Sequence, residues 1–340
     1  MLRQPTWLRP AASPRATETG PYRFRVFPSL GAFARGALIP RVIQLLLTLL
    51  VASTTLFFLL RVSGDPVRLV LGEAATPEAI EAARHALGLD RPLIVQYGAF
   101  LWNLARLDLG ESIRHRQPAL AVVLERVPAS AELCGAALAW AILVAIPLGI
   151  FTATRRSRWG QGLIGAGTLI GQSMPVFWLG VLLVLLFGVR LRLLPTFGYG
   201  GPRHLVLPAV TLGAFLMAKY THLVRAGLLA ILDSDYIRTA RAKGLGEWAV
   251  YFSHALRNSL IPLAAAVGAD ASYLLGGAVI TEIVFAWPGV GNLLVRSILS
   301  RDYPVVQSVI VVITFAAVLI SLLVDLMHGL LDPRIRKEAT

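Results

Sequence analysis

Long apolar runs alternate with short polar stretches along this chain. The first run, VIQLLLTLLVASTTLFFLL, fills the interval between Arg41 and Arg61 without a charge. As an α-helix with a rise of about 1.5 Å per residue, it would cross the hydrocarbon core of a bilayer. Further apolar runs with few or no charges cover residues 134–154, 159–189, 204–230, 258–281 and 303–324. The pattern predicts an all-α, polytopic membrane protein with about six transmembrane helices.

The charges between these runs predict which side of the membrane each connecting segment faces. Residues 1–40 carry six arginines and one acid, and the turn 155–158, the segment 225–257 and the carboxyl-terminal tail are also net positive. Because basic loops stay on the cytoplasmic side, these four segments predict cytoplasmic amino and carboxyl termini. The outer turn at 188–204 carries three arginines and no acid, but the other four segments outweigh it.

The polar stretch after the first run is charge-balanced. Residues 61–126 hold eight arginines and eight acids, as expected outside the membrane, and Thr76 followed by Pro77 predicts the start of a helix. We therefore expect a small extracytoplasmic helical cap between spans one and two. The predicted divisions are a cytoplasmic extension at 1–40, a first transmembrane helix at 41–61, an extracytoplasmic helical loop at 62–129, a membrane core at 130–330 that includes a cytoplasmic segment at 233–258, and a cytoplasmic tail at 331–340.

The composition supports a membrane protein and excludes several other classes. Hydrophobic residues make up 56% and charged residues 15% of the 340-residue chain, against about 45–50% and about 25% in soluble domains. The net charge of +13 lies in short stretches between apolar runs, which indicates membrane topology rather than a nucleic-acid-binding face. The single cysteine, Cys134, leaves no disulfide framework and no CxxC redox or metal motif.

The sequence contains no motif for catalysis. None of the three lysines is followed by Ser or Thr in a glycine-rich loop, so the chain has no P-loop to cradle phosphates. HExxH, GxSxG and paired-carboxylate arrangements do not occur either, which leaves an intramembrane protease without support. We therefore expect no catalytic residue, metal site or cofactor in this chain, and any ATP would be hydrolysed by another chain.

The cytoplasmic segment DSDYIRTARAKGLGEWAVYFSHALRNSLIP, residues 233–262, is the most informative stretch. Its first part predicts a helix that begins at Ser234 or Asp235 and has small residues on one side, among them Ala240 and Gly244. Small residues allow a helix to lie close to another surface. On composition alone we favour a solvated helical loop, because Ala and Arg are good helix formers.

Specific motifs change that interpretation. The segment contains DYIRTARAKGL and HALRNSLIP, and the chain also contains GDP at 64–66, LGLDRPLIVQY at 87–97, DLGESIR at 108–114, SMPVFWLG at 173–180, TEIVFAWPGVG at 281–291, RDYPVVQ at 301–307, and LLVDL and DPRIR near the end. With these motifs the chain resembles the inner-membrane permease subunits of the peptide and nickel class of ATP-binding-cassette importers, in particular the dipeptide and oligopeptide permease B subunits. The resemblance covers all but the amino-terminal extension.

That resemblance implies a type I importer permease in a bacterial plasma membrane. Such a subunit pairs with a second, similar permease and forms half of a pathway for dipeptides, longer peptides, glutathione-like compounds or nickel chelates. Two cytoplasmic ATPases, which bind ATP and Mg, drive transport, and an extracytoplasmic binding protein delivers the substrate.

The resemblance also places the contact with the ATPase on the cytoplasmic segment. The coupling residues that it implies are Asp235, Tyr236, Arg238, Thr239, Ala240, Arg241, Lys243 and Gly244. The general importer motif has Glu-Ala-Ala where this chain reads Arg238-Thr239-Ala240, so the missing glutamate leaves the individual contacts open.

Charges inside the apolar runs are candidates for function, because a charge at membrane depth is costly. Lys219 and Asp270 each lie about 16 Å from the cytoplasmic boundary at a rise of about 1.5 Å per residue. They can therefore form an ion pair, or Asp270 can face the pathway and attract the amino group of a peptide. An alternative function is a secondary transporter that uses these two residues as a proton or ion site.

Three further polar residues lie at kinks or ends of the predicted spans. Gln172 and Ser173 precede Pro175 in span three, where they can line the pathway or bond to the backbone groups that the proline leaves free. Glu282, near the outer end of span five, is a pathway candidate that could form part of a gate. Trp287, just beyond it, is expected to anchor the helix end at the lipid headgroups.

Overall fold

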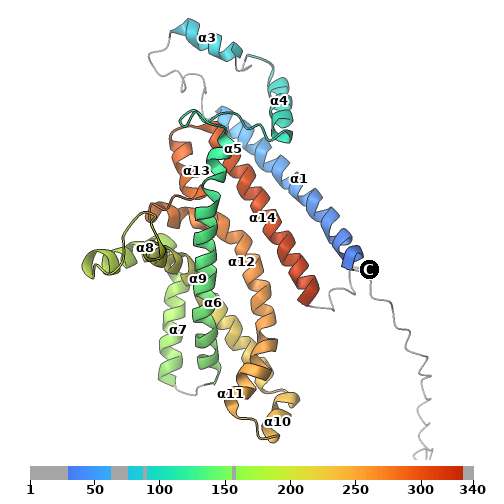
Figure 1. Ribbon diagram of the computed structural model, residues 1–340, viewed down its shortest axis with the longest axis vertical. Helices are drawn as coiled ribbons and strands as arrows, with labels where there is room; N and C mark the ends of the chain where they lie inside the picture. The colour runs from blue at the N-terminus through green and yellow to red at the C-terminus, as the bar shows by residue number, and fades with distance from the viewer. Residues whose placement is uncertain (1–29, 63–75, 87–89, 155–157, 332–340) are drawn as a thin grey trace, which may run out of the picture.

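The computed structural model describes residues 30–62, 76–86, 90–154 and 158–331 (Figure 1). Its helices are α1 (Leu30–Val62), α3 (Pro77–Ala86), α4 (Leu93–Ala105), α5 (Ala119–Leu124), α6 (Val127–Thr154), α7 (Arg158–Ser173), α8 (Val176–Leu183), η2 (Val184–Arg190), α9 (Pro202–Leu232), α10 (Asp235–Ala242), α11 (Glu247–Ala249), η3 (Val250–Ala255), α12 (Leu256–Val284), α13 (Val290–Leu299) and α14 (Tyr303–Leu331). The all-α prediction is confirmed. The predictions for residues 1–29, 63–75, 155–157 and 332–340 lie outside the described residues.

Among the residues that the structure describes, five helical stretches are long and apolar enough to cross a membrane. They are Val42–Leu59, Ala119–Thr154, Pro202–Leu232, Pro262–Val284 and Tyr303–Val324. These stretches match predicted spans one, two, four, five and six. The second stretch begins earlier than predicted because α5 precedes α6 with only a short break.

The predicted third span is not one straight helix. The stretches Ile164–Ser173 and Val176–Arg190 meet at an angle of 114°, and Pro175 lies at the break. Proline has no N–H to donate and its ring clashes with the preceding helical turn, so a helix tends to end before it. If this bent pair counts as one span, the described residues contain up to six stretches that are long and apolar enough to cross a membrane.

The core of the bundle is the close contact between α6 and α9. Ala137, Ala141 and Ala145 are fully buried on one face of α6 and share a hydrophobic cluster with Leu216 of α9. Gly213 on α9 lies so near to α6 that an added Cβ would come within 2.7 Å of the Ala137 carbonyl oxygen. Small residues let helix backbones approach each other, which is how helices associate where both are surrounded by lipid.

The two ends of the bundle carry different elements (Figure 1). α3, α4, α5 and α13 lie at one end and α10 and α11 at the other; following the orientation predicted from the charges, we call these the outer and inner ends. Phe57 of α1 packs against Tyr97 and Phe100 of α4, with ring centroids 5.3 and 5.2 Å apart. The Tyr97 hydroxyl also lies 2.6 Å from Thr54 Oγ1. These contacts attach α4 to α1; the extracytoplasmic position of this region stays a prediction.

Candidate functional site

α10, which carries most of the predicted coupling residues, has two different faces. Ile237 and Ala240 are buried and belong to the same hydrophobic cluster as residues of α6, α9 and α12. Of the predicted coupling residues, Ala240 is thus buried, and the remaining seven are exposed: Asp235, Tyr236, Arg238, Thr239, Arg241, Lys243 and Gly244. α10 is therefore fastened to the bundle along one face and presents the other face at the inner end.

The helix ends at Ala242, and Gly244 lies just beyond it. Gly244 has a φ of +78°, and its N–H donates to the Arg241 carbonyl at 2.9 Å while the N–H of Leu245 donates to the Ala240 carbonyl at 3.4 Å. This paired bonding is the Schellman motif, which favours glycine at the first position beyond a helix. Gly244 thus fixes where α10 ends, a role that its small size alone did not predict.

An ion pair braces the turn that follows α10. Arg241 donates from Nε to Glu247 Oε1 at 2.9 Å and from Nη2 to Oε2 at 3.3 Å. A hydrogen bond with Tyr251, followed by the bonds from Arg241, lowers the pKa of Glu247. Exposed pairs of this kind contribute little stability, but the two-point geometry fixes the orientation of Arg241. The glutamate that the general motif would place at position 238, within α10, is absent, and Glu247 supplies a carboxylate beyond the end of the helix.

The structure brings together two of the five predicted pathway residues. Nζ of Lys219 on α9 lies 2.8 and 2.9 Å from the two carboxylate oxygens of Asp270 on α12. Asp270 is only 9% exposed, so the pair neutralises two charges that would otherwise be costly at this depth. Gln172 and Ser173 are exposed next to the bend between α7 and α8, and a role for either in the pathway stays a prediction.

Glu282, the fifth pathway candidate, lies in the last turns of α12 and is 1% exposed. Its Oε1 accepts a hydrogen bond from Ser130 Oγ of α6 at 2.6 Å, and its Oε2 accepts one from the backbone N–H of Asn292 on α13 at 2.8 Å. Gly289 packs directly against the carboxyl group and leaves no space for a Cβ. Glu282 therefore connects α6, α12 and α13 at the outer end of the bundle.

Trp287 is not at the protein surface, and the prediction of a headgroup anchor is wrong. Its side chain is 1% exposed, and Nε1 donates to the Ala129 carbonyl oxygen at 2.8 Å. The Trp287 carbonyl oxygen accepts a hydrogen bond from Asn292 Nδ2 at 2.8 Å. The indole fills the space between α6 and the loop that leads to α13, which a position at the end of an apolar run does not reveal.

Asp302 joins two of the sequence motifs at the outer end. It is 1% exposed and accepts hydrogen bonds from Ser112 Oγ at 2.6 Å, from the N–H of Ile113 at 3.2 Å and from the N–H of Arg114 at 3.3 Å. The DLGESIR motif is thereby fixed to the RDYPVVQ motif at the start of α14. Sequence reasoning missed this role, although both motifs were noted, because nothing local pairs residues so far apart in the chain.

Within the described ranges, no group of three or more His, Cys, Asp and Glu side chains is placed to hold a metal ion. The site features are therefore an amphipathic helix at the inner end, one ion pair within the helix bundle and a hydrogen-bonded network at the outer end.

Comparisons with known proteins match the chain to transport proteins. A family described as "Binding-protein-dependent transport system inner membrane component" matches residues 145–337, and the corresponding amino-terminal family matches residues 36–134. Over 310 residues the chain is 40% identical to a protein of Brucella abortus (strain 2308) whose name assigns it provisionally as a peptide transport system permease; the match covers 88% of this chain and 99% of that protein.

Two further relatives have more specific names. The chain is 37% identical over 326 residues to the dipeptide transport system permease protein of Alkalihalophilus pseudofirmus, covering 87% of this chain and 98% of that one. It is 39% identical over 299 residues to the glutathione transport system permease protein of Escherichia coli (strain K12), covering 88% and 98% respectively.

Proposed function

Because the chain belongs to the family of binding-protein-dependent transport system inner membrane components, we propose that it conducts short peptides and that α10 connects it to a cytoplasmic ATPase. The chain is a transmembrane permease subunit of an ATP-binding-cassette importer. This assignment favours the importer over the secondary transporter that Lys219 and Asp270 left open. In the proposed complex a second, similar permease completes the pathway, two ATPases bind ATP and Mg, and a binding protein delivers the substrate.

The observation that carries the coupling proposal is the position of α10. Ile237 and Ala240 lie in the hydrophobic cluster that also holds α6, α9 and α12, so a displacement of α10 must be accommodated by the bundle. Outside this buried stripe α10 and the residue after it carry the exposed cations Arg238, Arg241 and Lys243. Arg238 lies 3.7 Å from Asp235 and Arg241 pairs with Glu247, so Lys243 adds the excess positive charge. An ATPase with an acidic docking cleft would complement this face, and two conformations of the ATPase that contact it differently would bias the permease between two states.

Replacing Arg238 and Lys243 together with glutamate tests the coupling contact. We expect recovery of the ATPase subunits with the purified permease to fall more than about tenfold, because reversed charges at an interface repel an acidic partner. Recovery is measured by affinity purification from membranes, followed by the ATPase activity of the recovered complex. The matched control replaces Arg190 and Arg203 with glutamate on the turn at 188–204, and normal recovery of ATPase with the α10 variant would contradict the proposal.

The peptide substrate is proposed from the names of the relatives, which refer to peptide, dipeptide and glutathione transport. Cells that lack other peptide importers and express the complete system should take up labelled dipeptides and tripeptides. Uptake should disappear when the gene for this chain is deleted and should be inhibited by unlabelled peptides. Uptake of a nickel chelate that peptides do not inhibit would contradict the peptide assignment while leaving the permease function intact.

A further inference from the structure

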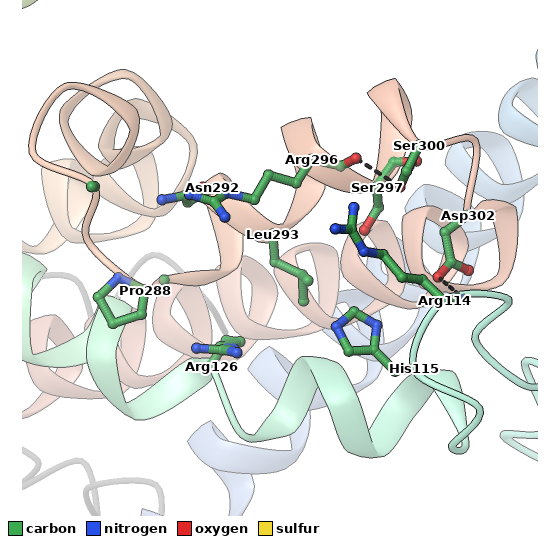
Figure 2. A pocket seen from close by; sticks show the side chains of 12 residues that line it. Arg114, His115, Arg126, Pro288, Asn292, Leu293, Arg296, Ser297, Ser300 and Asp302 are labelled. Carbon is green, nitrogen blue, oxygen red and sulfur yellow. Dashed lines mark hydrogen bonds between the residues drawn. The ribbon is translucent and has the colours of Figure 1, made fainter. Parts of the chain in front are cut away.

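A cavity of about 370 Å³ at the outer end is lined by basic side chains (Figure 2). Arg114 and His115 come from the loop before α5, Arg126 from the junction of α5 and α6, and Arg296 from α13, and they surround the space beside Leu293. We refer to this space as the basic cavity. It lies apart from α10 and from the Lys219–Asp270 pair.

The charges in the basic cavity do not balance. Three guanidinium groups, on Arg114, Arg126 and Arg296, face one carboxylate, on Asp302, which leaves two excess positive charges. Among the residues that the structure describes, none of these three arginines forms an ion pair. Asp302 is 1% exposed and already accepts three hydrogen bonds. The cavity thus offers several donors to an anion and little to a cation.

The walls of the cavity are held in place before any ligand binds. Arg296 donates from Nε to Asn292 Oδ1 at 2.7 Å, and Asn292 is itself bonded to the Trp287 carbonyl oxygen. The backbone of Arg114 is fixed by its bond to Asp302. Positioned guanidinium groups bind carboxylates with two parallel hydrogen bonds, and the conformational cost of binding is low when the donors are already oriented.

We propose that the basic cavity receives an acidic side chain of the extracytoplasmic binding protein. This inference rests on the proposed function, because it requires a binding protein that docks at the outer end. Arg114 and Arg296 are exposed, so a carboxylate on another protein's surface can reach them. A free peptide fits less well, because it also carries an ammonium group. Asp302, the one carboxylate among the described residues that line the cavity, already accepts hydrogen bonds from its own donors.

The test uses the complete complex of permeases and ATPases in lipid nanodiscs, with its binding protein as the titrant. The variant replaces Arg114 with glutamate and Arg296 with glutamine. We expect the dissociation constant to rise more than about tenfold at low salt, and the salt dependence of binding to become weaker, because fewer charges are complementary across the interface. The matched control, Arg203→Glu with Arg190→Gln on the turn at 188–204, makes the same change of charge outside the cavity and should raise the constant less than about threefold.

The remaining outcomes also decide the question. Unchanged binding, or equal weakening in the variant and the control, overturns the proposal. Normal binding combined with lower uptake of free peptides than of carboxyl-terminally amidated peptides would assign the cavity to the substrate and overturn it as well. Normal assembly and basal ATPase activity show that the variant is folded. If no ATPase subunit is recovered with the purified wild-type permease, the proposed function is wrong. The proposal for the basic cavity is decided separately, by the binding measurements with the binding protein.

Discussion

Replacing Glu282 with alanine should lower the free energy of unfolding by about 2–6 kcal/mol, because it leaves two buried donors without an acceptor at about 1–3 kcal/mol each. These donors are the Ser130 hydroxyl and the Asn292 N–H. The substitution also opens a void against Gly289, which packs on the carboxyl group. The free energy can be measured by titrating the purified chain in mild detergent with a denaturing detergent.

Two control variants separate this structural role from a gate. Glu282→Gln keeps the shape of the side chain and one acceptor oxygen, so it should lose roughly half as much stability as alanine. Ser130→Ala removes one partner and should cost about 1–3 kcal/mol for the same reason. A variant with alanine at position 282 that keeps wild-type stability but leaks substrate would contradict the network and support the gate.

The sequence predicted features that depend on local composition or on depth along a helix. The apolar runs identified five stretches that could cross a membrane, and counting residues from the membrane boundary placed Lys219 and Asp270 at one level, where the structure pairs them at 2.8 Å. Both results follow from periodicity and from the fixed rise of an α-helix. The functional roles assigned to the coupling and pathway residues stay predictions.

The features that sequence reasoning missed depend on contacts between distant segments. Glu282 at a span end could have been a gate, and what decides its environment is Ser130, 152 residues away in the chain. Trp287 had the position of an interfacial anchor but is buried against Ala129. The size of the bend at Pro175 was missed for a different reason. Hydropathy shows that residues 159–189 are apolar, but it does not show that the helix axis changes direction by 114° within them.

Breaking the Lys219–Asp270 pair should have the second large effect. Lys219→Met or Asp270→Leu alone leaves one unpartnered charge, which costs about 2.5–3.5 kcal/mol near the centre of a membrane-spanning helix. The double variant removes both charges and should be more stable than the sum of the single effects predicts, because neither charge remains to be compensated. The four proteins can be compared by the same detergent titration, together with the amount of folded protein in the membrane.

Transport by the double variant distinguishes a structural pair from a binding site. If the pair only neutralises two charges, uptake should follow the amount of folded complex, and free and N-acetylated peptides should be affected equally. If Asp270 attracts the amino group of the substrate, uptake of free peptides should fall relative to that of N-acetylated peptides at equal amounts of complex. Strictly additive losses of stability in the cycle would contradict an energetic coupling between the two charges, even though they lie within hydrogen-bonding distance. The cycle therefore measures the contribution of the ion pair to folding separately from any contribution to substrate selection.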